Sequence, residues 1–324
     1  MSADRQFFEA VCRCFDLGTL GATPVTVEGG LSNRLFRVTT NQGEYAVKRM
    51  VANAEAPSFK RNVEESFAVE RLALAASIAM PGPIPVPGSD EALGRITDRG
   101  EPCWVRVHRW VSAKRVKAEE IEPGDLAQVG GILAALHRLP LSSREVPAPH
   151  VPSAPERNWR AALSSHAGAP ALIDTIEVLE DTVRRGYLTD TSRRVLSHRD
   201  LDAKNLLRRA DGTLVLIDWD AAGSVNPQWD AIGVALDWSG IWHGAVSREA
   251  FEAVLDAYTI AGGTLEPVTP ASFAGWAEGM LHWLWFNLER SGSTDPGERP
   301  RGQAEVEATV RFLPVAADWI ANQP

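Results

Sequence analysis

The chain has 324 residues, which is long enough for two lobes because single hydrophobic cores stop growing near about 250–300 residues. Its formal net charge of −9 argues against nucleic acid as a partner and is compatible with a cationic substrate. No apolar run is long enough for a signal peptide or a membrane span, and three cysteines form no disulfide framework, so we expect a cytoplasmic protein that contacts no membrane.

The chain begins with apolar residues at helical spacing, which predict a helix that ends at Gly18. Two β-rich runs then flank the small, polar turn 28–33. Gly30, Ser32 and Asn33 of this turn could bring backbone N–H groups and short side chains over phosphates. Most glycine turns merely connect strands. A phosphate-binding role for this turn is therefore supported only by its position before a strand that carries a lysine.

This third strand, 44–50, places Lys48 and the small Ala46 on one face, where there is room for a ligand. A strand lysine is usually solvated at an edge, but its position after a glycine turn favours a contact with phosphate. The helix predicted over 64–79 carries three acids, and we favour Glu70 as the one that reaches Lys48 and fixes its ammonium. The alternative for these acids is a solvated helix face.

Prolines exclude a helix from 80–88, and two strands are predicted at 95–97 and 103–108. The residues after the second strand should cross between the lobes, with backbone groups from His108 to Trp110 facing the base of a bound nucleotide.

Helical patterns dominate from Pro123 onward, so a β-rich first third precedes a helical remainder. The predicted fold is therefore α+β and two-lobed. We expect a nucleotide-binding lobe over 1–109 and a catalytic and substrate-binding lobe over 110–324.

The stretch 195–220 contains the parts of a phosphoryl-transfer site. Asp200 can accept the proton of an attacking hydroxyl, Asn205 can hold a metal, and Asp218 can hold the same or a second metal against a polyphosphate. The turn signal Asp211-Gly212 between two apolar runs predicts a hairpin that puts Asn205 and Asp218 side by side. Any one of these residues alone is better explained as a turn former or helix cap, whereas all of them at this spacing favour catalysis.

These residues resemble the aminoglycoside phosphotransferase and choline kinase group of small-molecule kinases, which shares the protein-kinase fold. The matching elements are Gly29-Gly30-Leu31-Ser32-Asn33, Ala46-Val47-Lys48, His198-Arg199-Asp200 with Asn205, Asp218-Trp219-Asp220, and Pro227 with Asp230. The resemblance implies that Asp200 is the catalytic base, that Asn205 and Asp218 bind Mg²⁺, and that Lys48 contacts the α and β phosphates of ATP.

Several features disfavour a protein substrate. Asp218 is followed by Trp219-Asp220 in place of Phe-Gly, no Ala-Pro-Glu comes after them, and the short distance to Pro227 leaves no room for a long activation loop. Asp202 stands where serine/threonine protein kinases carry a lysine. A pseudokinase that serves as an interaction module is also disfavoured, because no catalytic group is missing.

The leading hypothesis is transfer of phosphate from ATP, or another nucleoside triphosphate, to a hydroxyl of a small cationic molecule such as an aminoglycoside-like antibiotic. The alternative is a kinase of choline, ethanolamine or another metabolite. Indoles beside carboxylates in the C-terminal helices could hold an amine by charge and cation–π attraction, although an aromatic stripe at helical spacing more often belongs to a core. The candidate substrate residues are Asp202, Asp220, Trp238, Trp283 and Glu289.

Overall fold

The computed structural model describes residues 3–27, 33–51, 54–141, 157–164, 169–191 and 193–323. By mutual contacts the chain separates into two compact units, which we call unit 1 (Met1–Val116 with Lys204–Gly223) and unit 2 (Lys117–Ala203 with Ser224–Pro324). Unit 1 includes the hairpin of the 195–220 stretch because this hairpin pairs with residues 114–115. The lobe boundary that we expect after residue 109 stays a prediction. No helix in the described ranges combines the length and apolar character that crossing a membrane requires.

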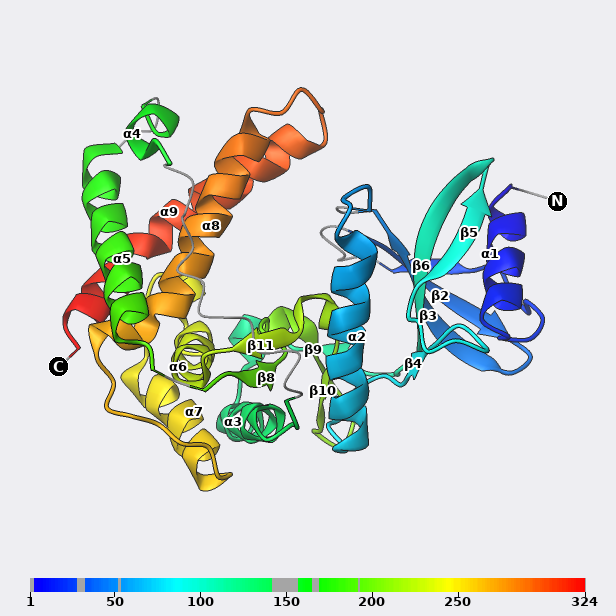
Figure 1. Cartoon of the computed structure of the whole chain (residues 1–324), viewed down its shortest axis with the longest axis horizontal. Helices are drawn as coiled ribbons and strands as arrows, with labels where there is room; N and C mark the ends of the chain where they lie inside the picture. Colours follow the sequence, from blue (N-terminus) through cyan, green and yellow to red (C-terminus); the bar gives the residue numbers. More distant parts are fainter. Residues whose placement is uncertain are drawn as a thin grey trace. The chain divides into compact units, whose positions relative to one another are not determined.

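The core of unit 1 is a sheet of antiparallel strands in the order β1-β2-β3-β6-β4, with β5 paired to β6 (Figure 1). Its strands are β1 (Val25–Val27), β2 (Arg34–Thr40), β3 (Gly43–Met50), β4 (Pro83–Ile84), β5 (Gly94–Asp98) and β6 (Glu101–Arg109). The strands that we expected at 44–50, 95–97 and 103–108 are therefore confirmed, each with small shifts at its ends.

The two faces of this sheet are chemically different because successive strand residues point to opposite sides. One face is apolar and packs against helix α1 (Ala3–Cys14), as in the contact between the Phe8 and Phe36 rings, whose centroids lie 5.0 Å apart. Lys48 and Arg106 stand directly opposite each other in the β3–β6 register and point to the other face. Helix α2 (Phe59–Ala75) supplies the glutamate that meets Arg106.

The hairpin predicted within 195–220 is present in unit 1. Strands β9 (Leu206–Arg208) and β10 (Leu214–Leu216) pair antiparallel around Gly212, whose positive φ of +86° suits glycine in a tight turn. Strand β9 also pairs with β7 (Lys114–Arg115), which ties the hairpin to the N-terminal part of the chain.

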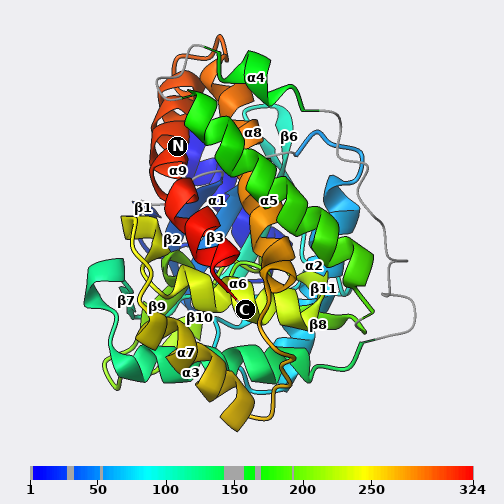
Figure 2. The ribbon, with the colours of Figure 1, turned by 90° about the vertical axis from the view of Figure 1, so that its left-hand side faces the viewer.

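Unit 2 is mainly helical. Its helices are α3 (Pro123–His137), α4 (Trp159–Ala162), α5 (Ala169–Thr189), α6 (Pro227–Asp237), α7 (Arg248–Ile260), α8 (Ala274–Ser291) and α9 (Glu298–Ala321). Helix α3 packs against α7, and α8 packs against both α5 and α9 (Figure 2). A Cβ at Gly130 would lie 2.6 Å from the Cβ of Ala257, so glycine permits the close approach of α3 and α7. The α+β architecture predicted from the sequence is confirmed.

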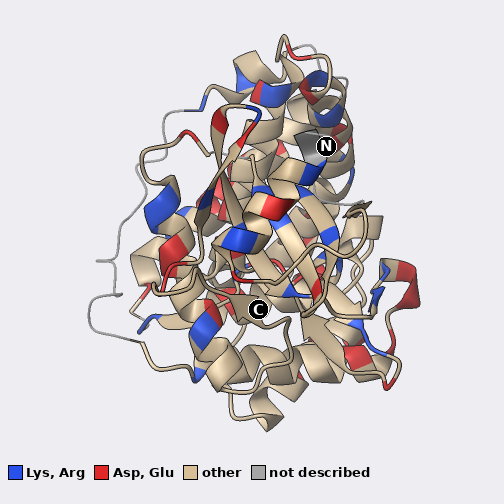
Figure 3. Ribbon diagram, turned by 90° about the vertical axis from the view of Figure 1, so that its right-hand side faces the viewer, with Lys and Arg blue, Asp and Glu red and all other residues tan. Residues whose placement is uncertain are grey.

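Acidic and basic residues are interspersed along the ribbon in Figure 3. The net charge of −9 therefore does not come from a single acidic segment.

Candidate active site

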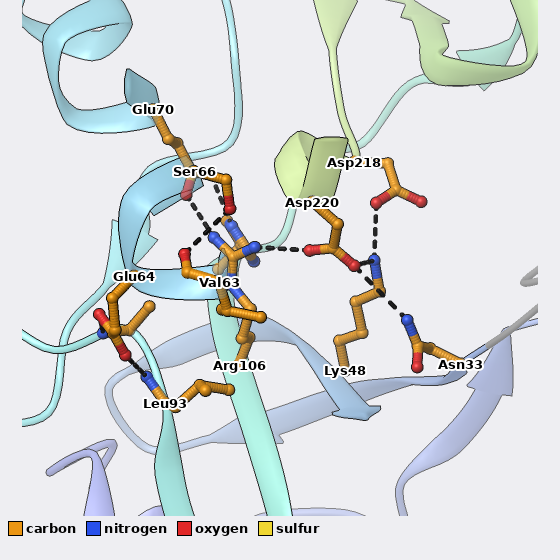
Figure 4. A network of polar contacts seen from close by, with 12 residues as sticks. Asn33, Lys48, Val63, Glu64, Ser66, Glu70, Leu93, Arg106, Asp218 and Asp220 are labelled. Carbon is orange, nitrogen blue, oxygen red and sulfur yellow. Dashed lines mark hydrogen bonds and ion pairs between the residues drawn. The ribbon is translucent and has the colours of Figure 1, made fainter. Parts of the chain in front are cut away.

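In unit 1, Lys48 lies between two carboxylates. Its Nζ is 2.7 Å from Asp218 Oδ1 and 2.6 Å from Asp220 Oδ2 (Figure 4). Asp218 follows strand β10 and adopts a left-handed backbone conformation with φ of 63°. Asp220 lies in the short 3-10 helix Trp219–Ala221, which begins directly after Asp218. Burial alone would lower the pKa of Lys48, but the two carboxylates hold that pKa above its ordinary value. The lysine is thus fixed in its charged form.

Glu70 has a different partner from the one that we expected. Its Oε2 accepts from the guanidinium of Arg106 at 2.5 Å, and its Oε1 lies 2.8 Å from His108 Nε2. The predicted pairing of Glu70 with Lys48 is therefore wrong in this structure: Arg106 takes Glu70, while Lys48 turns to the aspartates. Burial would raise the pKa of Glu70, but His108 and Arg106 hold it below its ordinary value.

Asp220 connects the two cations. Its Oδ1 accepts from Arg106 at 2.6 Å, while its Oδ2 accepts from Lys48. The Nδ2 of Asn33 lies 3.5 Å from the same Oδ2, and Asn33 Oδ1 accepts from the backbone N–H of Val51 at 2.8 Å. Asn33 therefore joins the end of the predicted phosphate turn to this cluster. Gly30 and Ser32 of that turn lie outside the described residues.

Two of the residues expected at the lobe crossing make hydrogen bonds within unit 1. The side chain of His108 meets Glu70, and its backbone lies opposite Ala46 in the β3–β6 pairing. The N–H of Trp110 donates to the carbonyl of Glu44 at 2.9 Å. The expectation that the backbone from His108 to Trp110 faces a nucleotide base stays a prediction.

Asn205 and Asp218 provide the oxygen donors that Mg²⁺ prefers. The N–H of Ile217 donates to the carbonyl of Asn205 at 2.9 Å, so the hairpin brings Asn205 beside the residue before Asp218, as the sequence predicts. Within the described ranges, no group of three or more His, Cys, Asp or Glu residues suited to a metal is present. Because Mg²⁺ keeps several waters and takes one or two carboxylates plus substrate phosphates, a donor set of one amide and one carboxylate fits it.

Unit 2 carries Asp200 on a short, strained loop. The residue before it, Arg199, has a φ of 63°, which is rare for a residue with a side chain. The residue after it, Leu201, is buried, and its carbonyl accepts from Trp238 Nε1 at 2.8 Å. The loop is therefore held by its backbone on the C-terminal side of Asp200.

Strand β8 (Val195–Ser197) holds the other side of the same loop. Ser197 Oγ donates to Asp230 Oδ2 at 2.5 Å, and His137 Nε2 lies 3.0 Å from the same oxygen. The second ring nitrogen of His137 is 2.9 Å from the hydroxyl of Tyr258. Asp230 of α6 thus connects β8, α3 and α7 beside the segment that leads to Asp200.

The predicted substrate residues differ in their burial and in their hydrogen-bond partners. Trp238 is buried, with 3% of its surface exposed, and its indole donates to the carbonyl of Leu201 in the loop that carries Asp200; its substrate role stays a prediction. Asp220 belongs to unit 1 and bonds Lys48 and Arg106, and its substrate role stays a prediction. Glu289 accepts from Trp285 Nε1 at 2.9 Å along helix α8.

Trp283 is half-buried on the same helix, with its ring 6.0 Å from that of Phe286, and Asp202 is half-buried beyond Leu201. The substrate roles of Asp202, Trp283 and Glu289 stay predictions.

Sequence reasoning missed Arg106, which carries much of the cluster. The sequence does contain a pattern that indicates its position. Val105 and Val107 flank Arg106 in a strand, and this alternation places Arg106 on the face opposite the apolar core. It also missed the hydrogen bonds that join Asp230 to Ser197 and His137, for which no spacing rule exists.

Comparisons with known proteins place the chain in a family and identify similar folds. Residues 24–271 match the family model described as the phosphotransferase enzyme family. No curated protein sequence gives a match.

Among solved structures, a spectinomycin phosphotransferase in complex with ADP and spectinomycin is similar, with a TM-score of 0.67 at 14% identity over 93% of this chain and 94% of that chain. A microcompartment-associated aminopropanol kinase has a TM-score of 0.65 at 16% identity over 96% and 98% of the two chains. A choline/ethanolamine kinase family protein from Mesorhizobium loti has a TM-score of 0.58 at 19% identity over 99% of each chain. The chain therefore shares the two-lobed, kinase-like fold of these proteins.

Proposed function

Because the chain belongs to the phosphotransferase enzyme family, we propose that it transfers the γ-phosphoryl group of ATP, or another nucleoside triphosphate, to a hydroxyl of a small, cationic molecule. The observation that carries this proposal is the cluster in which Lys48 bonds Asp218, next to Asn205. A fixed ammonium beside a carboxylate and an amide is what a polyphosphate with a divalent ion requires.

In this mechanism Asp200 accepts the proton of the acceptor hydroxyl as the oxygen attacks the γ-phosphorus. The bond between the γ-phosphorus and the bridging oxygen breaks, and the nucleoside diphosphate leaves with the bond's electrons. Lys48 neutralises charge on the α and β phosphates, and Asn205 and Asp218 would hold Mg²⁺, which would supply positive charge against the negative charge of the polyphosphate. Positioning and electrostatics supply most of the rate.

The acceptor class is proposed from chemistry and from similar proteins. The net charge of −9 is compatible with a cation, and Trp283 with Glu289 offers an indole and a carboxylate on one helix. Similar structures include kinases named for spectinomycin and for aminopropanol. An aminoglycoside-like or other cationic antibiotic is therefore the first candidate, and a choline-like or ethanolamine-like amino alcohol is the second.

A substrate panel tests the proposal. Purified enzyme with Mg²⁺ and ATP or GTP is offered aminoglycosides, spectinomycin, choline, ethanolamine, aminopropanol, sugars and a generic protein substrate. Nucleoside diphosphate release is followed, and product masses are measured. We expect one small molecule to gain a single phosphoryl group, with no product from the Asp200→Ala variant. Phosphorylation of the protein substrate with none of the small molecules would overturn the proposal.

A further inference from the structure

Arg106 is a fully buried cation that holds two segments of unit 1 together. Only 1% of its surface is exposed. One terminal nitrogen donates to Glu70 of helix α2 at 2.5 Å, and the other donates to Asp220, after strand β10, at 2.6 Å (Figure 4). The two ends of one planar group therefore bind carboxylates that lie 150 residues apart in the sequence (70 and 220).

The cluster is an alternating chain of charges. In order along the contacts it runs Glu70, Arg106, Asp220, Lys48, Asp218. Each inner member bonds two partners, so removing one of them leaves both neighbours without that counter-charge. The cost is largest at the buried end, because the side chain of Glu70 is fully buried whereas that of Asp218 is 46% exposed. Asp220 is the inner carboxylate: its Oδ2 accepts from Lys48 and its Oδ1 accepts from Arg106.

We propose that Arg106 is a positioning residue for phosphoryl transfer. Arg106 is the partner of Glu70 in place of Lys48, and it orients Asp220 against the Lys48 ammonium. The inference rests on the proposed function and deepens it, because it states what fixes the phosphate-binding lysine. It also assigns Asp220 to the nucleotide-binding side of the chemistry.

Geometry explains why the residue is an arginine. A guanidinium presents separate N–H groups at its two ends in a fixed plane, so it can face Glu70 and Asp220 together. A lysine ammonium is a single point on a flexible stem and cannot reproduce both contacts. Arg106→Lys therefore keeps the charge and removes the bridge.

The test compares Arg106→Lys with Arg49→Lys. Arg49 is a matched control because it lies on the neighbouring strand, points to the apolar face of the same sheet and pairs with Asp98. For Arg106→Lys we expect the Kd and KM for ATP to rise by about tenfold or more and kcat to fall, with the KM for the acceptor within about twofold of the parent value. Arg49→Lys should keep both KM values and kcat.

A purely structural role gives a different result, because loss of folded enzyme lowers the apparent kcat without changing either KM. Circular dichroism and thermal unfolding establish that each variant is folded. Parent-like Kd and KM for ATP in folded Arg106→Lys would overturn the inference. The Kd for ATP, measured by calorimetry without acceptor, tests Arg106 even if no acceptor of the panel is phosphorylated, so the two proposals can fail separately.

A double-variant comparison tests the partner assignment. In Arg106→Met the buried Glu70 loses its guanidinium, so adding Glu70→Gln should cost no further affinity for ATP and should recover part of it. If instead Glu70 acted on Lys48, Glu70→Gln would weaken ATP binding by the same factor in the parent and in Arg106→Met. Equal factors would therefore contradict the inference.

Discussion

In unit 1 the candidate nucleotide-binding residues are held by ion pairs: Lys48 and Arg106 each bond Asp220 through different carboxylate oxygens, at 2.6 Å. In unit 2 the segment that carries Asp200 is held by hydrogen bonds to its backbone and its neighbours, such as the bond from Trp238 Nε1 to the Leu201 carbonyl. Substitutions should therefore act differently in the two units. Losing Arg106 in unit 1 should leave the buried charge of Glu70 without its guanidinium and lower the affinity for an anionic ligand. Losing a hydrogen-bond partner in unit 2 should instead loosen the loop that carries Asp200, the proposed base.

The largest expected effect comes from the proposed catalytic base, Asp200. Asp200→Ala should lower kcat by about 10²–10⁴-fold, because it removes the proton acceptor of the hydroxyl. The Kd for ATP should stay within about twofold, since the residues that we propose to bind phosphate belong to unit 1. Steady-state kinetics and calorimetry measure the two quantities. Asp211→Ala, in the exposed hairpin turn, is the control. Turnover at the parent rate would show that Asp200 is not the base.

The next effect tests the support of the loop. Asp230 accepts from Ser197 and contacts His137, so Asp230→Ala should lower the free energy of unfolding by about 3 kcal/mol, because it leaves two buried polar groups without their acceptor. Asp230→Asn keeps an acceptor oxygen and should lose less. Urea unfolding of both variants gives the comparison, and equal losses would mean that the negative charge of the carboxylate, and not its shape or a single acceptor oxygen, decides stability.

A smaller effect is expected from the indole that holds Leu201. Trp238→Phe keeps an aromatic ring but leaves the buried carbonyl without its donor, which should cost about 1–2 kcal/mol of unfolding free energy and lower kcat. Trp285→Phe loses a hydrogen bond to Glu289 on the exposed side of α8 and should cost less than about 0.5 kcal/mol. A larger loss in Trp285→Phe than in Trp238→Phe would reverse this ranking.

Sequence patterns predicted what depends on neighbours in the chain. Strand alternation located Lys48 on its face, and the Asp211-Gly212 turn brought Asn205 next to the end of β10, because both depend on a few consecutive residues. The partner of Glu70 depends instead on the register between β3 and β6 and on where α2 packs. No local pattern reports those distances, so the sequence favours Lys48 as the partner of Glu70 where the structure has Arg106.

The hydrogen-bond partner of a tryptophan side chain likewise cannot be predicted from its neighbours in the sequence. Whether an indole N–H meets a ligand or a backbone carbonyl is set by tertiary packing, and Trp238 meets Leu201. Its sequence context of apolar helix residues describes burial but does not say what the nitrogen bonds.

The smallest expected effect concerns pH and the charges of unit 1. The pKa of Glu70 in the folded protein is held below its ordinary value by His108 and Arg106, against the opposing effect of burial. The unfolded chain therefore binds a proton more readily, and the stabilisation from ionised Glu70 is present above about pH 4.3 and lost as pH falls through the folded pKa. In Glu70→Gln this contribution is absent, so the free energy of unfolding should fall less steeply on acidification, by at most about 1.4 kcal/mol per pH unit.

Urea unfolding of the parent and of Glu70→Gln between about pH 5 and 3 measures these slopes. Glu65→Gln, on the exposed face of the same helix, should keep the parent slope. Parallel slopes for the parent and Glu70→Gln would mean that the buried ion pairs do not set the acid stability of unit 1, and the contrast with the hydrogen-bonded loop of unit 2 would then lose its electrostatic basis.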